Sequence, residues 1–422
     1  MWRPLSPKLT GLTRGLRFDA QELSGGLGDI GVMIPIVATL IIANGFNPTS
    51  VLLVFGATYL LSGLYFRIPM PVQPLKAMAA IAIAQGLSPE IVSAAGLVMA
   101  AIFLLLAFTN LIRPLSSLFT RHVVRGIQLG VGLLLIQSGY RLATSGPIVR
   151  GGEDFGIHLS GSYVPIALLA TVTLLPLIFV ASSRTRVPFM LLLLPPALLV
   201  GAFAAPSPLS SSMPGPVLHS PDLPAPATLL TAFLVLVLPQ IPLTLGNAVI
   251  ASTETARGYY GDRASKVSHR SVLISKGIAN TAAGILGGMP VCHGAGGHTA
   301  HYRFGARTGG ATVMLGGILI VLALGFGSGA AHFFALIPLP VLAALLCLVG
   351  IQHSLLARDV RGWPERAIVV AIAGIGFATG NLAWGFLAGI AADQLLRLAR
   401  RAFPLPSREE LPVAAAAVQS GS

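Results

Sequence analysis

The sequence predicts an all-α polytopic membrane protein with 14 transmembrane segments, arranged as two inverted repeats of seven. Of its 422 residues, 54% are hydrophobic and only 10% are charged, and the mean hydropathy is +0.81. A soluble protein carries about 25% charged residues. Apolar runs of roughly 17–25 residues lack strand alternation, which favours helices that satisfy their own backbone in lipid. A one-sided distribution of positive charge, described below, indicates the inverted repeat.

The N-terminal half opens with a basic segment, residues 1–22, that we expect to be cytoplasmic. It is not a cleavable signal peptide, because no short apolar core and small-residue cleavage site follow its charges. The first repeat is expected over residues 23–205. Its spans are expected at residues 25–42, 48–66, 69–84, 90–112, 123–144, 163–182 and 187–205.

The C-terminal half begins after a linker rich in proline and serine, residues 206–226, which we expect on the extracytoplasmic side. The second repeat is expected over residues 227–398, followed by a cytoplasmic tail, residues 399–422. We expect no C-terminal regulatory domain, because the tail is too short to hold one. The spans of this repeat are expected at residues 227–253, 272–287, 290–302, 311–328, 334–353, 366–379 and 382–398.

The positive charges lie almost entirely on one side of this arrangement. If the N-terminus is cytoplasmic, nearly all of the 27 Lys and Arg fall in cytoplasmic connections or in the tail. In this count, Lys276 is assigned to the connection before the ninth span. The exceptions are Arg141 and Arg150, after the fifth span, and Lys76, inside the third. This is the positive-inside pattern. The pattern supports an odd number of spans in each repeat. It also explains the basic pI of the chain, near 10.7, without nucleic acid as a partner.

Two segments interrupted by proline stand at matching positions of the two halves. Met70-Pro71-Val72 interrupts the third span, and the polar element Gln73-Pro74-Leu75-Lys76 follows it. Met289-Pro290-Val291 interrupts the tenth span, and Cys292-His293-Gly294 follows it. A helix of small residues then begins in each case. Paired broken segments at corresponding positions are the best sequence pointer to a transporter's binding site.

A helix that begins inside the membrane presents free N–H groups and the positive end of its dipole to a cavity. Such an N-terminus binds anions. Glycines let the backbone approach a ligand closely, and a lysine adds formal positive charge. We therefore expect the broken spans to bind an anion through Gln73, Lys76, Cys292, His293, Gly294, Ala295, Gly296 and Gly297.

Polar residues in the eighth and first spans extend this candidate site. Gln240, Thr244 and Asn247 are spaced i, i+4 and i+7, so they share one helix face. They could donate hydrogen bonds to the ligand or join neighbouring helices. Asp29 is an ionisable group near or within the membrane, and Glu254 is a weaker candidate of the same kind. Either could carry a coupled proton. The alternative roles for Asp29 are to offset the charge of Lys76 or to cap a helix at the cytoplasmic interface.

The sequence gives no reason to expect a metal, a cofactor or catalysis. Cys292, His293, His298 and His301 include soft metal ligands, but no second cysteine is near and glycines intervene. We expect His298 and His301 at the cytoplasmic end of the tenth span. An enzyme would need a nucleophile with a separate base and an orienting group, and the adjacent pair Cys292 and His293 lacks that third group.

Four stretches resemble the MOT1 molybdate transporter family: residues 71–77, 239–247, 289–297 and 302–307. The likeness covers about residues 24–397. Gly28-Asp29-Ile30-Gly31 fits the family's first span, although Val32-Met33 replaces its more usual polar or aromatic residues. The family is similar to the sulfate permeases and their inverted-repeat fold. The resemblance implies a core domain, spans 1–4 and 8–11, moving against a gate domain, spans 5–7 and 12–14, with an oxyanion between the third and tenth spans.

The resemblance makes molybdate the expected substrate of a secondary active importer working by alternating access. Sulfate has the same charge and shape, so a transporter for sulfate or another anion is the alternative. A nucleobase–proton symporter would be expected to need acidic residues in the eighth and tenth spans, where this chain has none at the matching positions. Importing an anion against a negative interior costs about 2.3 kcal/mol per charge per 100 mV, which favours co-transported protons. We expect a multi-pass inner-membrane protein in contact with lipid, with both termini cytoplasmic and a homodimer as one possible assembly.

Overall fold

A computed structural model describes residues 15–109, 111–112, 115, 119–159, 162–185, 187–204, 215–217, 224–327 and 329–402. Much of the expected N-terminal segment, linker and tail lies outside these residues. Within them, seven helices are long and apolar enough to cross a membrane, or nine if each of two bent pairs counts as one span. The mainly helical membrane architecture is therefore confirmed. The count of 14 remains a prediction, because several expected spans are shorter helices.

The first half begins with two helices that bend by 51° at Gly28 and Asp29. Asn47 then caps the next helix by accepting a hydrogen bond from the N–H of Ser50, and Pro48 occupies its first turn, where no N–H donor is needed. The helices of this half are α2 (Ala20–Leu27), α3 (Ile30–Asn44), α4 (Pro48–Phe66), α5 (Lys76–Gln85), α6 (Pro89–Phe108), α8 (Arg121–Ala143), α9 (Ile166–Arg184) and α10 (Phe189–Ala204).

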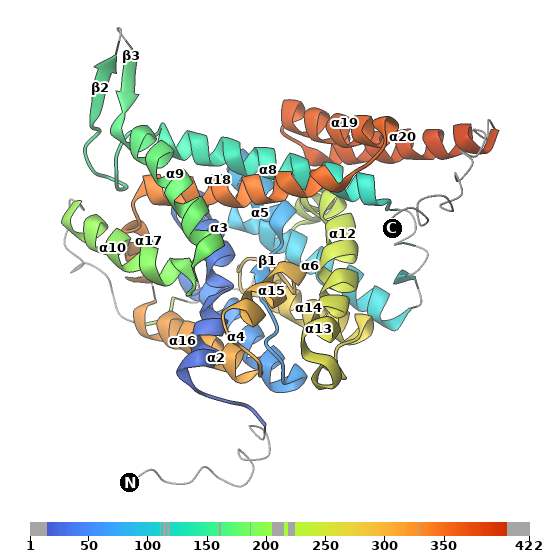
Figure 1. Ribbon diagram of the computed structural model, residues 1–422, viewed down its shortest axis with the longest axis horizontal. Helices are drawn as coiled ribbons and strands as arrows, with labels where there is room; N and C mark the ends of the chain where they lie inside the picture. The colour runs from blue at the N-terminus through green and yellow to red at the C-terminus, as the bar shows by residue number, and fades with distance from the viewer. Residues whose placement is uncertain are drawn as a thin grey trace, which may run out of the picture.

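The sequence analysis missed a β-hairpin before α9. Strands β2 (Gly156–Leu159) and β3 (Ser162–Pro165) pair antiparallel, and the hairpin projects beyond the helices in Figure 1. The sixth span was expected from residue 163, but α9 begins at Ile166, whose N–H donates to the carbonyl of Phe155 at 2.8 Å. A Ser-Gly dipeptide at residues 160–161 is a turn signal that would have indicated the hairpin.

The second half begins with one long helical stretch that contains two π-helical segments. Its parts are α11 (Pro226–Ala232), η2 (Phe233–Val237), α12 (Leu238–Leu243), η3 (Thr244–Ala251), α13 (Ser252–Tyr260) and the 3₁₀ turn η4 (Gly261–Ala264). The remaining helices are α14 (His269–Ile285), α15 (Ala295–Arg303), α16 (Gly310–Phe326), α17 (Gly329–Ala335), α18 (Leu339–Leu355), η5 (Leu356–Asp359), α19 (Trp363–Thr379) and α20 (Leu382–Ala402).

The start of α18 corrects the expected twelfth span, which was placed from residue 334. Pro338 stands at the N-cap and Pro340 lies in the first turn, so the helix begins at Leu339. The chain before it forms the short helix α17, which bends sharply from α16. Proline fixes the backbone at the start of a helix and lacks the N–H that an interior position requires.

The helices form two groups, visible in Figure 1. In the core bundle, α4 packs on α16 and α6 packs on α14, around α3, α5, α12, α13 and α15. In the flanking bundle, α8 packs on α18, α19 and α20, and α9 packs on α18. The contacts are reciprocal. The second helix of the first half, α4, packs on the fourth helix of the second half, α16, and the second helix of the second half, α14, packs on the fourth helix of the first half, α6. This exchange of partners is what two inverted repeats produce.

Glycines bring α4 and α16 into close contact in the core bundle. A Cβ added at Gly309, the N-cap of α16, would lie 2.1 Å from the carbonyl oxygen of Gly63. One added at Gly316 would lie 2.5 Å from the carbonyl oxygen of Gly56. Small residues that permit such approach are the usual basis of helix packing in lipid, where the hydrophobic effect does not drive helices together.

Candidate functional site

The two broken segments meet at the centre of the core bundle. Strands β1 (Gln73–Pro74) and β4 (Val291–Cys292) pair antiparallel, with Gln73 opposite Cys292. The N–H of Leu75 extends the pairing by donating to the carbonyl of Pro290 at 3.0 Å. Because α5 and α15 follow their strands directly, they leave the pair in opposite directions with both N-termini toward the centre (Figure 1). The broken third and tenth spans are thereby confirmed.

The second helix of each half anchors the matching position of each motif. The hydroxyl of Tyr59 in α4 donates to the carbonyl of Val72 at 2.9 Å. The Asn280 amide in α14 donates to the carbonyl of Val291 at 2.9 Å and accepts from its N–H at 3.0 Å. The sequence analysis missed both anchors. Tyr59 and Asn280 are isolated polar residues in apolar helices, and this is the signal that would have indicated them, because a buried polar group needs a hydrogen-bond partner.

The N-terminus of α15 keeps free donors. Gly294 is its N-cap and accepts a hydrogen bond from the N–H of Gly297 at 3.1 Å. The N–H groups of Ala295 and Gly296 meet no acceptor in the part of the chain that the structure describes. Gly296 is exposed, and a Cβ added there would have nothing within 4 Å. Two oriented donors at the positive end of a helix therefore face open space, as an anion site requires.

Lys76, the first residue of α5, lies beside this N-terminus. Its ammonium nitrogen is 4.0 Å from the position that a Cβ on Gly294 would take. The side chain is half-buried, and it forms neither a hydrogen bond nor an ion pair with the described residues. A half-buried ammonium that has no internal partner beside a helix N-terminus provides positive charge for binding an anion.

The N-terminus of α5 is capped internally, which corrects the expected role of Gln240. The side-chain oxygen of Gln240 accepts from the N–H groups of Ala77 at 2.9 Å and Met78 at 3.2 Å. Its amide nitrogen donates to the hydroxyl of Thr244 at 3.1 Å. Asn247 is half-buried and makes no hydrogen bond among the described residues. It lies in the π-helical segment η3, whose wider turn moves it off the α-helical face that was expected to hold all three residues.

We expect Gln240→Leu to destabilise the protein, because it leaves two buried N–H donors without an acceptor. Loss of a helix cap of this kind costs about 1–2 kcal/mol. Thermal unfolding of the purified protein in detergent would show a lower Tm. Gln352→Leu, at an exposed glutamine of α18 without a hydrogen bond, is the matched control and should leave the Tm nearly unchanged. Equal values for both variants would exclude the capping role.

His293 holds the two motifs together instead of facing a ligand. Its Nδ1 lies 2.7 Å from the carbonyl oxygen of Pro71, so this nitrogen carries a proton and donates. Its Nε2 lies 2.9 Å from the hydroxyl of Ser275 in α14. Both ring nitrogens are occupied, so the expected direct donation to an anion is wrong for this conformation. Cys292 is also buried, with its sulfur 3.8 Å from the carbonyl oxygen of Pro74.

Asp29 lies at the bend between α2 and α3 and faces the centre. Its carboxylate accepts a hydrogen bond from the Gln73 side-chain amide and lies 3.0 Å from the Tyr59 hydroxyl, whose single hydrogen is shared between Asp29 and the Val72 carbonyl. It makes no side-chain cap for α3 and is only 1% exposed, so the alternative of an interfacial helix cap is wrong. Gln73 thus binds Asp29 with its nitrogen, while its oxygen has no partner in the described structure.

Two buried histidines complete the surroundings of Asp29: His301 stands in the last turn of α15, as expected, but both rings are turned into the protein. His301 donates from Nδ1 to the carbonyl of Gly25 at 2.9 Å, and its Nε2 lies 4.0 Å from the Asp29 carboxylate. His298 has one ring nitrogen 3.2 Å from the hydroxyl of Ser252. The remaining nitrogen of each ring has no hydrogen-bond partner among the described residues.

The glycine at 297 makes the approach of α15 to this cluster possible. A Cβ there would lie 2.3 Å from the Cβ of Pro71 and 2.9 Å from a carboxylate oxygen of Asp29. Gly297 therefore serves packing, whereas Gly296 borders open space. The two glycines were predicted together as ligand-binding residues, and only their three-dimensional surroundings distinguish them.

Two further charged residues, Lys276 and Glu254, differ in their burial. Lys276 was counted with the cytoplasmic connection, although the expected ninth span, residues 272–287, contains it. In the structure it lies inside α14 with no exposed surface, so counting it in the connection was wrong. Its ammonium donates to the carbonyl of Ala248 in η3 and lies 5.4 Å from the ring centre of Phe103. A π-helical segment breaks the regular pattern of backbone pairing, and the lysine supplies the donor that this carbonyl needs. Glu254, the weaker proton candidate, is exposed.

Comparison with known proteins agrees with this geometry. A family model described as "Molybdate transporter of MFS superfamily" matches residues 21–135 and 232–352. Molybdate transporter 2 of Arabidopsis thaliana is 31% identical, over 90% of this chain and 88% of its own length. A probable sulfate transporter of Mycobacterium tuberculosis is 28% identical, over 71% of this chain and 54% of its own length.

Solved structures show a similar fold. The transmembrane domain of a cyanobacterium bicarbonate transporter, BicA, matches with a TM-score of 0.63 at 17% identity, over 89% of this chain and 97% of that one. The murine anion transporter Slc26a9, in its inward-facing state, matches with a TM-score of 0.62 at 15% identity, over 95% of this chain and 73% of that one. Together with the two broken spans and the matched relatives, these findings establish that the chain belongs to the molybdate transporter family.

Proposed function

We propose that this protein imports a tetrahedral oxyanion, molybdate first, bound at the N-terminus of α15. The observation that carries the proposal is Lys76, a cation without an internal partner beside the free N–H groups of Ala295 and Gly296. A dianion would receive a charge-assisted hydrogen bond from the lysine and two neutral ones from the backbone. The names of the relatives support molybdate as the first choice.

The proposed transport step is alternating access, in which the core bundle carries the site past the flanking bundle. Contacts between the bundles are made by α5 and α12 against α8, and by α3 against α18. The half-helix α5, which bears Lys76, therefore borders the flanking bundle directly. Movement of one bundle against the other would open the site first to one side of the membrane and then to the other.

Sulfate is the second candidate, because it offers the same charge and shape to the same donors and a relative is described as a probable sulfate transporter. A nucleobase would require carboxylates to accept its ring N–H groups. The matching positions carry Gln240, Asn247, Cys292 and His293 instead. The donor-rich site thus favours an anion over a nucleobase.

We propose that protons are co-transported and that Asp29 carries one. Asp29 is buried and hydrogen-bonded within the cluster that joins both broken spans, so its charge state is linked to the geometry of the site. Glu254 is exposed and makes no hydrogen bond to that cluster among the described residues. We further propose an inner-membrane location with both termini cytoplasmic, and a homodimer as the assembly to be tested.

The test is uptake of labelled molybdate into proteoliposomes that contain the purified protein. We expect saturable uptake that resists excess sulfate and increases with an inward proton gradient. Gly296→Val, which would place a side chain over the free N–H groups, should abolish uptake. Gly317→Val is the control, because a Cβ at Gly317 in α16 also meets nothing within 4 Å, but far along the chain from these donors. Stronger sulfate uptake would overturn the substrate, and uracil uptake alone would overturn the anion site.

A further inference from the structure

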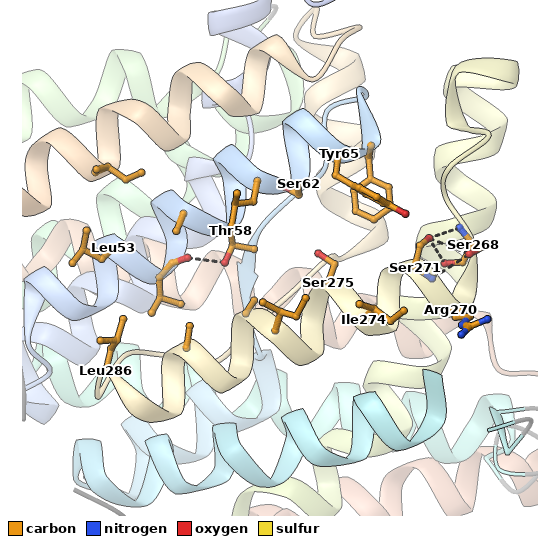
Figure 2. A pocket seen from close by; sticks show the side chains of 18 residues that line it. Leu53, Thr58, Ser62, Tyr65, Ser268, Arg270, Ser271, Ile274, Ser275 and Leu286 are labelled. Carbon is orange, nitrogen blue, oxygen red and sulfur yellow. Dashed lines mark hydrogen bonds between the residues drawn. The ribbon is translucent and has the colours of Figure 1, made fainter. Parts of the chain in front are cut away.

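A groove of about 800 Å³ runs between α4 and α14 on the outside of the core bundle. Figure 2 shows Leu53 and Leu286 near one end and Tyr65 and Arg270 near the other. Between these ends the lining is mostly apolar, with the hydroxyl residues Thr58, Ser62 and Ser275 among it (Figure 2). Two of its large apolar side chains, Leu61 and Ile278, are each 59% exposed. A protein surface of this kind needs an apolar covering, which a membrane supplies.

The two ends of the groove differ in chemistry. Hydroxyl groups of Tyr65, Ser268 and Ser271 gather at one end beside Arg270, whereas the other end has only apolar side chains around Leu53 and Leu286 (Figure 2). The hydroxyls of Ser268 and Ser271 already cap α14 in a capping box. The groove is therefore amphipathic along its length, with one polar end.

Two cations flank the polar end and lack acidic partners. The Arg270 guanidinium lies 5.5 Å from the ring centre of Phe108 on α6. The Lys266 ammonium lies 5.2 Å from the Tyr65 ring centre and donates to the Tyr65 carbonyl at 3.1 Å. Both side chains are exposed, and neither forms an ion pair with the carboxylates that the structure describes. The polar end is thus complementary to an anion.

The groove is longer than the hydrocarbon of one leaflet of a bilayer. At about 1.5 Å per helical residue, Arg270 and Leu286 are about 24 Å apart along α14, while one leaflet's hydrocarbon is about 15 Å thick. An acyl chain that starts near the cations would therefore lie against the apolar lining for the full depth of its leaflet.

We propose that this groove binds one anionic glycerophospholipid, with its phosphate at Arg270 and Lys266 and an acyl chain along α4 and α14. The groove also contacts the transport machinery, because Ser275 lines it and its hydroxyl bonds His293, which holds Pro71. Lipid binding itself is independent of which substrate the protein transports.

The test is native mass spectrometry of the delipidated full-length protein, titrated with phosphatidylglycerol or phosphatidylcholine of equal chain length. We expect one tightly bound phosphatidylglycerol and weaker phosphatidylcholine. The double variant Lys266→Gln, Arg270→Gln should weaken phosphatidylglycerol binding roughly 30-fold, about fivefold for each basic side chain lost. Arg263→Gln, which removes an exposed arginine outside the groove lining, should change it little.

A steric variant separates this site from general attraction of anionic lipid to basic surfaces. Ala282→Phe fills the apolar part of the groove without changing any charge. It should abolish tight binding of both lipids, and size-exclusion chromatography would verify that the protein remains folded. Equal affinity for the two lipids in the unmodified protein, or unchanged phosphatidylglycerol binding in Ala282→Phe, would overturn the proposal.

Discussion

Replacing Lys76 by glutamine is expected to reduce molybdate uptake, measured as kcat/KM, by about 10- to 100-fold. The structure places the ammonium beside the free N–H groups of α15, and it forms no hydrogen bond or ion pair with the described residues that would have to break first. A hydrogen bond from a charged donor contributes about 1.5–3 kcal/mol, which corresponds to that range in rate. The measurement is initial uptake into proteoliposomes over a range of molybdate concentrations.

The folded protein should tolerate this substitution, because no hydrogen bond or ion pair of Lys76 with the described residues is lost. The Tm of Lys76→Gln is therefore expected to equal or exceed that of the unmodified protein, since an unpaired charge in a partly buried place is unfavourable. Lys76→Arg retains the charge and should restore part of the uptake. Full uptake by Lys76→Gln would exclude the lysine as an anion ligand.

The sequence was sufficient to find the region of the site but not the orientation of its side chains. The matching Met-Pro-Val motifs predicted two broken spans around a centre, and the two broken segments pair in the structure through Gln73–Pro74 and Val291–Cys292. The same motifs suggested Gln240 and His293 as donors to a ligand. Their partners are the N-terminus of α5 for one residue and Pro71 and Ser275 for the other. Such partners come from distant segments, so spacing along one helix cannot reveal them.

The buried charges were misplaced for a related reason. Lys276 resembled a loop residue, because basic residues cluster before it in the sequence. Inside α14 it satisfies a carbonyl of the π-helical segment η3, and no periodicity in the sequence marks that segment. His298 and His301 likewise precede arginines but are turned inward by the close packing of α15 at Gly297. Local composition predicted the long apolar helices and failed where a polar residue serves a single buried partner.

Asp29→Asn is expected to abolish the stimulation of uptake by a proton gradient while retaining exchange of molybdate across the membrane. Asparagine has the size of aspartate but carries no titratable proton. The cluster can accommodate it: the Gln73 side-chain oxygen has no partner, so a flipped Gln73 amide can accept from the new side-chain amide, while Tyr59 still donates. Folding and anion binding should therefore persist, and only the coupling should fail.

The energetics make this separation measurable. Moving a dianion inward against 100 mV costs about 4.6 kcal/mol, and each co-transported proton removes half of that electrical cost. A gradient of one pH unit adds about 1.4 kcal/mol, or tenfold accumulation, for each proton. The experiment compares gradient-driven uptake with counterflow at equal pH. Asp29→Asn should lower gradient-driven uptake to the level seen without a gradient and keep counterflow within about twofold of the unmodified protein. If the proton gradient still stimulates uptake in this variant, the coupled proton is carried by another group.

His301 is the next group to examine, because its Nε2 lies 4.0 Å from the Asp29 carboxylate without a hydrogen-bond partner among the described residues. This position opposite the carboxylate makes the ring the candidate for a second coupled proton. His301→Gln keeps a donor for the Gly25 carbonyl but cannot titrate. If the ring carries a second coupled proton, this variant should lower the accumulation of molybdate driven by each pH unit about tenfold, because one coupled proton is lost. A ring that only positions Asp29 would leave that slope unchanged.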